Sequence, residues 1–235
     1  MRPISPIISI IVPVFNEEKT VLEILQKLEY LKNSIFSCEV IVIDDGSTDR
    51  TIDILKENTK IINKIFYNET NRGKGFSVKK GIQNADGKYI IFQDADLEYD
   101  PSDLIKFSKV IEEFEPDLVI GSRFNYSNYT RSHNILNKFG NNLITLNFNI
   151  LYNTTFTDIY SCYACFKKEL LNPNELKSEG FEQHAEILCK VVKKGKKFYE
   201  VPINYNGRSH EEGKKIKFYD IFFVLYQIFK ERILK

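Results

Sequence analysis

Short apolar runs alternate with helix-like patterns through the first 125 or so residues, and this alternation limits the possible folds more than any other feature. Helical patterns occupy 16–31, 76–84 and 101–114, with a shorter one after Asp49. Runs suited to buried strands lie at 7–14, 39–43, 60–67, 88–93 and 117–121. Strands that alternate with helices form a largely parallel sheet. The sequence therefore predicts an α/β fold with a mostly parallel, Rossmann-like central sheet flanked by helices.

Two of the predicted strands run directly into aspartates. The run 89–92 is followed by Asp94-Ala95-Asp96, and the run 40–43 by Asp44-Asp45. Asp94 and Asp96 point the same way in extended chain, and the small Ala95 leaves space beside them. Buried carboxylates are costly unless a cation or ligand donors compensate them, and Mg²⁺ accepts carboxylate and phosphate oxygens. Because ligands bind beyond the carboxyl ends of parallel strands, these residues indicate a nucleotide-sugar site.

The second half has weaker periodicity but no break that would separate two domains. Helices are predicted at 135–150 and 181–194, followed by a short strand at 197–201. With 235 residues, 43% of them hydrophobic, the chain can bury one substantial core. We expect a single domain over 1–235. Its parts are a nucleotide-sugar-binding half at 1–123, an acceptor-side half at 124–210 and an amphipathic C-terminal helix at 211–235.

Charge and hydropathy exclude several functions. The 33 basic and 32 acidic residues leave a net charge of +1, so nucleic acid is not an expected partner. No apolar run reaches the 18 or more residues of a spanning helix, and the first six residues lack a signal peptide's apolar stretch. The prediction is a cytoplasmic protein. GxGxxG and GxxxxGK[ST] are both absent, which disfavours dinucleotide and P-loop sites.

The C-terminal segment is rich in aromatic residues. Ten of the twelve residues at 218–229 are apolar or aromatic, with basic residues on both sides. The segment is too short to span a membrane, but it fits a helix in the headgroup plane. Two predictions fit the segment equally well. One is peripheral membrane contact through 214–235 on the cytoplasmic face, and the other is a helix packed on the domain or on a homodimer partner.

An ordered set of motifs gives the chain a family resemblance. The motifs are Ile11-Val-Pro-Val-Phe-Asn-Glu-Glu18, Val42-Ile-Asp-Asp-Gly-Ser-Thr-Asp49, Asn71-Arg-Gly-Lys-Gly75, Gln93-Asp-Ala-Asp-Leu-Glu98, Gly121-Ser-Arg123, Thr157-Asp158, Gly180-Phe-Glu182 and Arg208-Ser-His210. From residue 8 to about 220 the chain resembles the family 2 glycosyltransferases of the GT-A fold. It is most similar to their dolichyl-phosphate-mannose and dolichyl-phosphate-glucose synthase branch, with its bacterial polyprenyl-phosphate relatives.

Three departures from that family pattern limit what the resemblance implies. The transmembrane helices that many synthases of this branch append are missing from the sequence. Glu98 occupies a position where some members carry glutamine. The Gln-x-x-Arg-Trp signature of processive polysaccharide synthases is absent, and the chain has no tryptophan. We therefore expect transfer of one sugar per encounter.

On the donor side, the resemblance implies contacts with the nucleotide and with a metal ion. The residues implied for nucleotide contact are Pro13, Phe15, Glu17, Asp44, Asp45, Lys74, Asp94 and Ala95. Asp45 resembles the aspartate that accepts the base N–H, which uracil and guanine both offer; a helix-capping role better suits Asp49. Asp94, Asp96 and Glu98 are expected to hold Mg²⁺ or Mn²⁺ on the diphosphate and so stabilise the leaving group.

On the acceptor side, the resemblance implies basic residues for a phosphate and one or more acidic groups for catalysis. The predicted acceptor-phosphate residues are Arg123, Arg131, Arg208, Lys214 and Lys215. Asp96, Arg123 and Asp158 are the predicted catalytic residues. Candidate general bases are Asp158, Glu182, His184 and Glu186, with His184 expected on the helix surface. A phosphate acceptor would need no base, because its oxygen is already anionic.

The predicted function is an inverting, metal-dependent transfer of one sugar from a nucleotide-diphosphate sugar to a polyprenyl phosphate. UDP-glucose is slightly favoured over GDP-mannose as the donor. One alternative is transfer to a hydroxyl of a glycan or lipid-linked saccharide in cell-surface polysaccharide synthesis. A second alternative is a non-catalytic nucleotide-sugar-binding homologue, which the intact Asp94, Asp96 and Glu98 disfavour.

Overall fold

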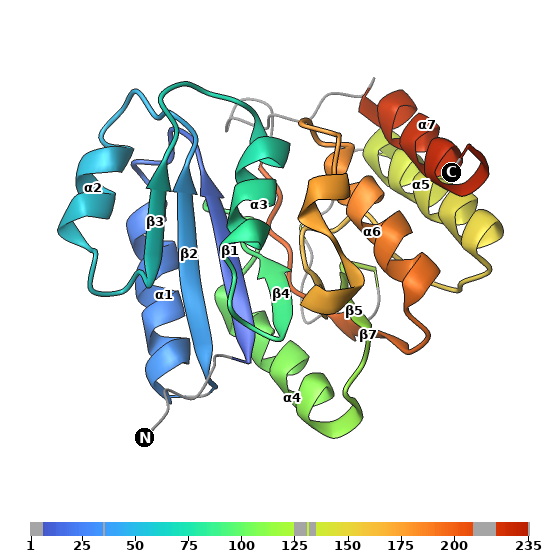
Figure 1. The fold of residues 1–235 in the computed structure, drawn as a ribbon, viewed down its shortest axis with the longest axis horizontal. Helices are drawn as coiled ribbons and strands as arrows, with labels where there is room; N and C mark the ends of the chain where they lie inside the picture. Colours follow the sequence, from blue (N-terminus) through green and yellow to red (C-terminus); the bar gives the residue numbers. More distant parts are fainter. Residues whose placement is uncertain (1–6, 35, 125–130, 132–134, 209–219, 235) are drawn as a thin grey trace.

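Seven strands form one mixed sheet in the order β3-β2-β1-β4-β6-β5-β7 (Figure 1). The computed structural model describes residues 7–34, 36–124, 131, 135–208 and 220–234. The strands are β1 (Ile8–Val14), β2 (Cys38–Asp44), β3 (Lys64–Tyr67), β4 (Tyr89–Phe92), β5 (Leu118–Ser122), β6 (Ala164–Lys167) and β7 (Phe198–Pro202). All neighbouring pairs are parallel except those of β6, which is antiparallel to β4 and β5. The predicted α/β fold with a mostly parallel sheet is confirmed.

Seven α-helices surround this sheet. They are α1 (Val21–Ser34), α2 (Thr51–Glu57), α3 (Lys74–Gln83), α4 (Leu104–Phe114), α5 (Ile135–Tyr152), α6 (Gln183–Lys194) and α7 (Asp220–Ile233). α1 and α3 cover opposite faces of the sheet near β1 and β2 (Figure 1). α5, α6 and α7 gather at the end of the molecule opposite α2 (Figure 1). The molecule therefore has a regular parallel half beside α1, α2 and α3 and a half rich in helices beside β5 and β7.

The central strands are buried on both faces, which explains their nearly continuous apolar sequences. Every residue of β2, β4 and β5 is buried, and β1 is buried except for partly exposed Pro13. Residues of these strands dominate the core together with apolar side chains of α1 and α6. This rigid core fixes where the strand ends, and the polar residues after them, lie in space.

The structure differs from the sequence prediction in three local details. β6 was not predicted, because its four residues carry no clear period. The predicted strand at 60–67 is reduced to β3, since the residues before it form a turn. The helix predicted from Pro101 begins as a 3₁₀ turn, Pro101–Asp103, in which the Asp100 side chain accepts a hydrogen bond from the Ser102 N–H.

The C-terminal helix α7 is two-sided. Val224 and Ile228 are fully buried, and Glu231 is almost fully buried against Lys190 of α6. The opposite face leaves Phe222 and Phe223 more than half exposed. α7 thus packs on the domain through one face, and the membrane contact that the sequence offered as the alternative stays a prediction for its exposed face. Within the described ranges, no helix is both long enough and apolar enough to cross a membrane.

Candidate active site

The carboxyl ends of β1, β2 and β4 meet at one edge of the sheet. β1 lies between the other two strands, and Val14 is in register with Asp44. Pro13 and Phe15, near the end of β1, are both partly exposed at this edge. The sheet therefore brings the predicted nucleotide residues of β1 next to the acidic residues that follow β2 and β4.

Asp45 organises the loop before α3. Its carboxylate accepts hydrogen bonds from the Asn68 side chain at 2.8 Å and from the backbone N–H groups of Arg72 at 3.1 Å and Gly73 at 2.8 Å. Asp45 is only 4% exposed. Three donors thus already use the carboxylate that the sequence assigned to a nucleobase, and they give it a positioning role in this structure.

Asp44 differs from its neighbour because one of its oxygens is unsatisfied. The side chain is fully buried, and Oδ1 accepts from the backbone N–H groups of Gly46 and Ser47. Its Oδ2 has no hydrogen-bond partner within the described part of the chain. A buried acceptor without a partner costs about 1–3 kcal/mol, so it calls for an explanation. A ligand donor at the end of β2 would supply the missing bond.

Lys74 and Asp94 form an ion pair across the site. Lys74 opens α3, and its Nζ lies 2.6 Å from Asp94 Oδ1. Burial opposes the charged forms of both groups, but their mutual attraction prevails: it raises the pKa of Lys74 well above its usual value and lowers that of Asp94. A cation in the first helical turn is disfavoured by the helix dipole, so Asp94 is what holds Lys74 there.

Asp96 lies among acidic neighbours, and no ion pair joins it to a basic side chain within the described residues. Burial, and then the charges of Asp94 and Glu98, raise the pKa of its carboxyl to about 7. Its carboxylate accepts a local hydrogen bond from the Glu98 N–H at 3.0 Å. Like charges held together in this way are stabilised by a divalent cation, which favours the ionised carboxylate.

Glu98 fastens a distant segment rather than joining the other two carboxylates. Its Oε2 accepts from the Tyr205 hydroxyl at 2.8 Å, and its Oε1 accepts from the Arg208 N–H at 2.7 Å. No group of three His, Cys, Asp or Glu side chains forms a ready metal site in the part of the chain that the structure describes. The predicted trio is therefore not assembled here, and Asp94 and Asp96 remain as the pair that fits Mg²⁺ or Mn²⁺ with diphosphate oxygens.

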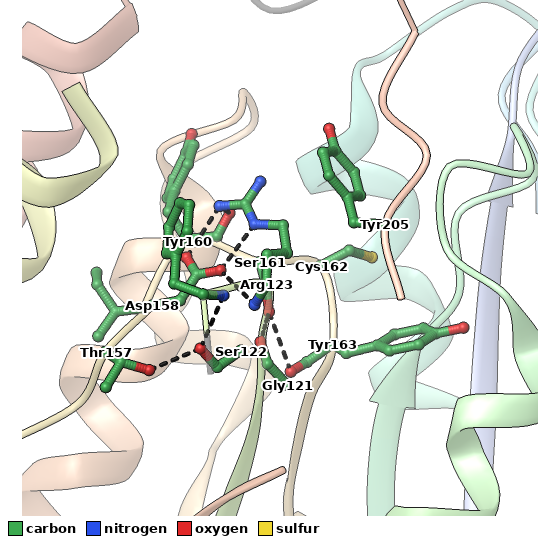
Figure 2. Close-up of polar contacts among 12 residues, drawn as sticks. Gly121, Ser122, Arg123, Thr157, Asp158, Tyr160, Ser161, Cys162, Tyr163 and Tyr205 are labelled. Atoms are coloured by element: carbon green, nitrogen blue, oxygen red, sulfur yellow. Dashed lines mark hydrogen bonds and ion pairs between the residues drawn. The ribbon is translucent and has the colours of Figure 1, made fainter. Parts of the chain in front are cut away.

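Arg123, directly after β5, forms a bidentate ion pair with Asp158. Figure 2 shows the guanidinium facing the carboxylate: Nε lies 2.7 Å from Oδ2, and Nη2 lies 2.9 Å from Oδ1. The backbone N–H of Arg123 also donates to Oδ2 at 3.1 Å. Arg123 is 9% exposed and Asp158 is fully buried. This two-pronged geometry makes Asp158 a positioning group for the arginine.

The surroundings of the Arg123–Asp158 pair reinforce its geometry. Nη2 donates to the Tyr160 carbonyl at 3.2 Å, and the Tyr205 ring lies 5.1 Å from the guanidinium carbon (Figure 2). Burial opposes the charge on Arg123, but Asp158 raises its pKa far above the usual value. The arginine thus stays charged and fixed at the end of β5.

The other predicted acceptor-phosphate residues differ in the contacts that they make. Arg208 pairs with Glu17, with Nη2 3.1 Å from Oε2, so both predicted site residues lie together. Arg131 is exposed and donates from Nη1 to the Gly207 carbonyl at 3.0 Å. Arg131 therefore contacts the segment that Glu98 holds, and Arg208 is part of that segment. Lys214 and Lys215 lie outside the described residues.

The candidate general bases on α6 and just before it either accept hydrogen bonds from backbone N–H groups or have a lowered pKa. Glu186 is fully buried and accepts from the backbone N–H groups of Lys177 and Ser178. Glu182, at the helix start, accepts from the Gly180 N–H at 3.3 Å. His184 is partly exposed, but its Nε2 is buried, and burial followed by the charge of Lys74 lowers its pKa to about 4.

Sequence reasoning missed one residue of this site altogether. Tyr205 bridges the two sides, because its hydroxyl donates to Glu98 while its ring lies against Arg123. It pairs with Tyr99 through an isolated antiparallel bridge. The sequence carries no signal for this contact, since Tyr205 follows β7 in a segment without a motif.

The family described as glycosyl transferase family 2 matches residues 9–173, which include the strand ends, Arg123 and Asp158. The chain belongs to glycosyltransferase family 2. It is therefore an enzyme that takes its sugar from a nucleotide sugar.

Two curated family 2 relatives are longer than this chain. The low-salt glycan biosynthesis hexosyltransferase Agl6 of Haloferax volcanii is 28% identical over 212 residues, which are 88% of this chain and 50% of that protein. The dolichol-phosphate mannosyltransferase of Pyrococcus furiosus is 26% identical over 230 residues, 95% of this chain and 63% of that protein. The chain thus spans half to just under two thirds of their length.

Solved structures support the GT-A fold of this glycosyltransferase. Glucosyl-3-phosphoglycerate synthase from Mycobacterium tuberculosis, solved with Mn²⁺, uridine diphosphate and phosphoglyceric acid, superposes with a TM-score of 0.72. The match covers 97% of this chain and 79% of that one at 17% identity. At this identity the likeness concerns the fold.

Proposed function

We propose that this glycosyltransferase transfers one sugar, with inversion, from a nucleoside-diphosphate sugar to a polyprenyl phosphate. Uridine diphosphate is the favoured nucleotide and glucose the favoured sugar. The named activity of the dolichol-phosphate mannosyltransferase relative supports a polyprenyl-phosphate acceptor. The UDP and Mn²⁺ in the mycobacterial synthase support the donor and the metal.

The observation that carries this proposal is that three of the four candidate general bases are unsuited to the role, while the fourth, Glu182, already accepts a hydrogen bond from the Gly180 N–H. Asp158 is fully buried and neutralised by Arg123, and Glu186 is fully buried and saturated by backbone donors. The lowered pKa of His184 makes it a poor base at neutral pH. A hydroxyl nucleophile needs such a base, whereas a phosphate oxygen arrives already ionised. The residues present therefore favour a phosphate acceptor.

On the donor side, Asp94 and Asp96 would hold Mg²⁺ or Mn²⁺. When bound, the metal neutralises the charge that develops on the departing nucleoside diphosphate. Phe15 and Pro13 offer partly exposed apolar surface for the nucleoside, and Asp44 offers its unsatisfied Oδ2 to a ligand donor. Residues 1–123 would thus bind the donor, as their sequence predicts.

On the acceptor side, Arg123 would attract and orient the attacking phosphate. A guanidinium that is already fixed loses little side-chain entropy when it meets an anion. Arg131 and Arg208 carry further positive charge on the neighbouring segment. The roles of Lys214 and Lys215 remain predictions from the sequence.

A lipid-linked acceptor would require contact with a membrane surface, and α5 and α7 offer a surface of suitable chemistry. The two helices pack closely, since a Cβ at Gly140 of α5 would lie 2.4 Å from Ile221 of α7. Outward apolar residues on the two helices are each 48–79% exposed: Ile135, Phe139, Leu146, Ile150, Phe222, Phe223, Tyr226 and Phe229. Lys230 and Arg232 provide basic groups nearby, as an interfacial helix requires.

The donor proposal is tested by thermal shift with UDP-, GDP- and dTDP-sugars, each with Mn²⁺ and with EDTA. A true donor at a hundredfold excess over its dissociation constant stabilises the native state by about 2.7 kcal/mol. We expect a metal-dependent rise with one nucleotide class that is lost in Asp96→Ala and kept in Asp53→Ala, an exposed aspartate of α2. No rise with any sugar nucleotide would refute the donor site.

The acceptor proposal is tested with radiolabelled UDP-glucose, or with the donor that the thermal shift selects. Polyprenyl phosphate, the dephosphorylated polyprenol and a soluble oligosaccharide are offered in parallel. We expect label in the organic phase only with the phosphate. Label on the polyprenol or the oligosaccharide would instead indicate transfer to a hydroxyl and would overturn the phosphate assignment.

The membrane proposal is tested by sedimentation with vesicles of phosphatidylglycerol and phosphatidylcholine at low salt. We expect the protein to pellet with anionic vesicles and the double variant Phe222→Ser/Phe223→Ser to stay in the supernatant. Tyr30→Ser is the matched control, because Tyr30 is a 66% exposed aromatic residue on α1. If the wild-type protein stays in the supernatant, the α5–α7 surface has another partner, such as a second copy of the chain.

A further inference from the structure

His184 carries a buried nitrogen that the fold itself does not use. The residue lies in the first turn of α6, and the Tyr160 ring meets the imidazole edge-on at 5.9 Å between centroids and 87° between planes. Its Nε2 is shielded from solvent and has no hydrogen-bond partner among the residues that the structure describes. Buried polar atoms are nearly always paired, so this nitrogen indicates a missing partner.

The other ring nitrogen defines what Nε2 can do. The backbone of Ile159 favours a proton on the imidazole, and because Nε2 has no partner among the described residues we assign that proton to Nδ1. Burial and then the charge of Lys74 lower the pKa of the imidazole to about 4, so the ring is neutral at pH 7. Nε2 therefore presents a lone pair and can only accept a hydrogen bond.

The imidazole lies within electrostatic reach of both charged pairs of the site. The charges of Lys74 and Asp94 act on it from the donor side, and that of Asp158 acts on it from the acceptor side. Its ring neighbour Tyr160 also accepts from Arg123 through its carbonyl (Figure 2). A glycosyl group in transfer must occupy the space between a diphosphate near Asp96 and an acceptor near Arg123.

We propose that His184 is a specificity-determining residue, whose Nε2 accepts a hydrogen bond from a hydroxyl of the glycosyl group being transferred. The inference rests on the proposed function, because it assumes a nucleotide sugar at the carboxyl ends of β2 and β4. The neutral ring suits a sugar hydroxyl, which donates a proton to the hydrogen bond without giving it up. Nε2 would select sugars that place a hydroxyl there, since a sugar without it leaves the nitrogen unpaired.

The experiment compares each nucleoside diphosphate with its sugar in two variants. His184→Phe keeps a flat ring without an acceptor, and His184→Gln places an amide oxygen near the position of Nε2. Dissociation constants are measured by calorimetry in Mn²⁺ for UDP and UDP-glucose, and for GDP and GDP-mannose. The quantity compared is the affinity ratio of the sugar nucleotide to its bare nucleotide, which a merely structural role of the ring would not change.

We expect His184→Phe to lower that ratio about tenfold, the size of one hydrogen bond lost from a buried acceptor, and to leave binding of the bare nucleotide unchanged. His184→Gln should keep the ratio within about threefold of the wild-type value. An unchanged ratio in His184→Phe would overturn the proposal, as would an equal loss for nucleotide and sugar nucleotide. A wild-type protein that binds none of the four compounds would instead refute the proposed function itself.

Discussion

Two ion pairs, one partly exposed and one buried, stand on either side of the site, and they are built differently. Lys74 and Asp94 meet through one contact of 2.6 Å, and both side chains keep some exposure, 35% and 19%. Arg123 and Asp158 meet through two side-chain contacts and one backbone contact, with exposures of 9% and 0%. We therefore expect Lys74 and Asp94 to exchange each other for a metal or a phosphate when a ligand binds. Arg123 and Asp158 should stay paired throughout.

The difference matches what each side of a glycosyltransferase site has to do. A donor site must take up a metal and a diphosphate and release them in every cycle, so its charges need exchangeable partners. An acceptor site gains from an arginine that is already oriented, because no reorganisation then accompanies the reaction. Three predictions test this contrast between an exchangeable and a permanent pair, beginning with the largest effect.

Asp158→Asn should be the most damaging of the substitutions. It removes the charge that compensates buried Arg123, and breaking a buried pair in this way costs about 3–5 kcal/mol of unfolding free energy. Urea denaturation at pH 7.5 measures the loss. Asp86→Asn is the matched control, since its 69% exposed side chain pairs with Lys64 at the surface and should cost well under about 1 kcal/mol. Equal losses in the two variants would refute the permanent pair.

Lys74→Met should cost less and should depend on ligands. Asp94 keeps some access to solvent, so we expect a loss of about 1–2 kcal/mol in the metal-free protein. Added Mn²⁺ and UDP should shrink that loss, because the metal replaces the missing ammonium beside Asp94. The measurement is urea denaturation with and without the two ligands. A loss of the same size in both conditions would mean that the pair is not exchangeable.

The smallest effect concerns pH. The pKa of Asp96 is raised to about 7 by burial and by its acidic neighbours, so its proton competes with the metal below that pH. Mn²⁺ affinity in the presence of UDP should therefore rise about tenfold between pH 6 and pH 8 and level off above. Calorimetry across this range provides the test. A profile that does not change with pH would show that the metal displaces no proton from Asp96.

The sequence predicted the parallel half of the molecule well, because its signals are local. Apolar runs and the aspartates after them lie within a few residues of each other, so both the strands and their polar ends could be read directly. The role of Asp158 could not, since its partner Arg123 is 35 residues away and only the folded sheet joins them. The helical pattern likewise placed His184 on α6 without indicating that Tyr160 covers it.

The antiparallel strand β6 comes late in the sequence, and this has a consequence for folding during synthesis on the ribosome. β4 pairs with β1 on one side, and its other edge is closed only by β6, which follows about 70 residues later. At about 5–20 residues per second, the nascent chain carries that apolar edge unpaired for roughly 4–14 seconds. Open strand edges recruit other chains. The segment Tyr89–Phe92 is thus where a chaperone would protect this enzyme during its synthesis, before Ala164–Lys167 emerges to close the sheet.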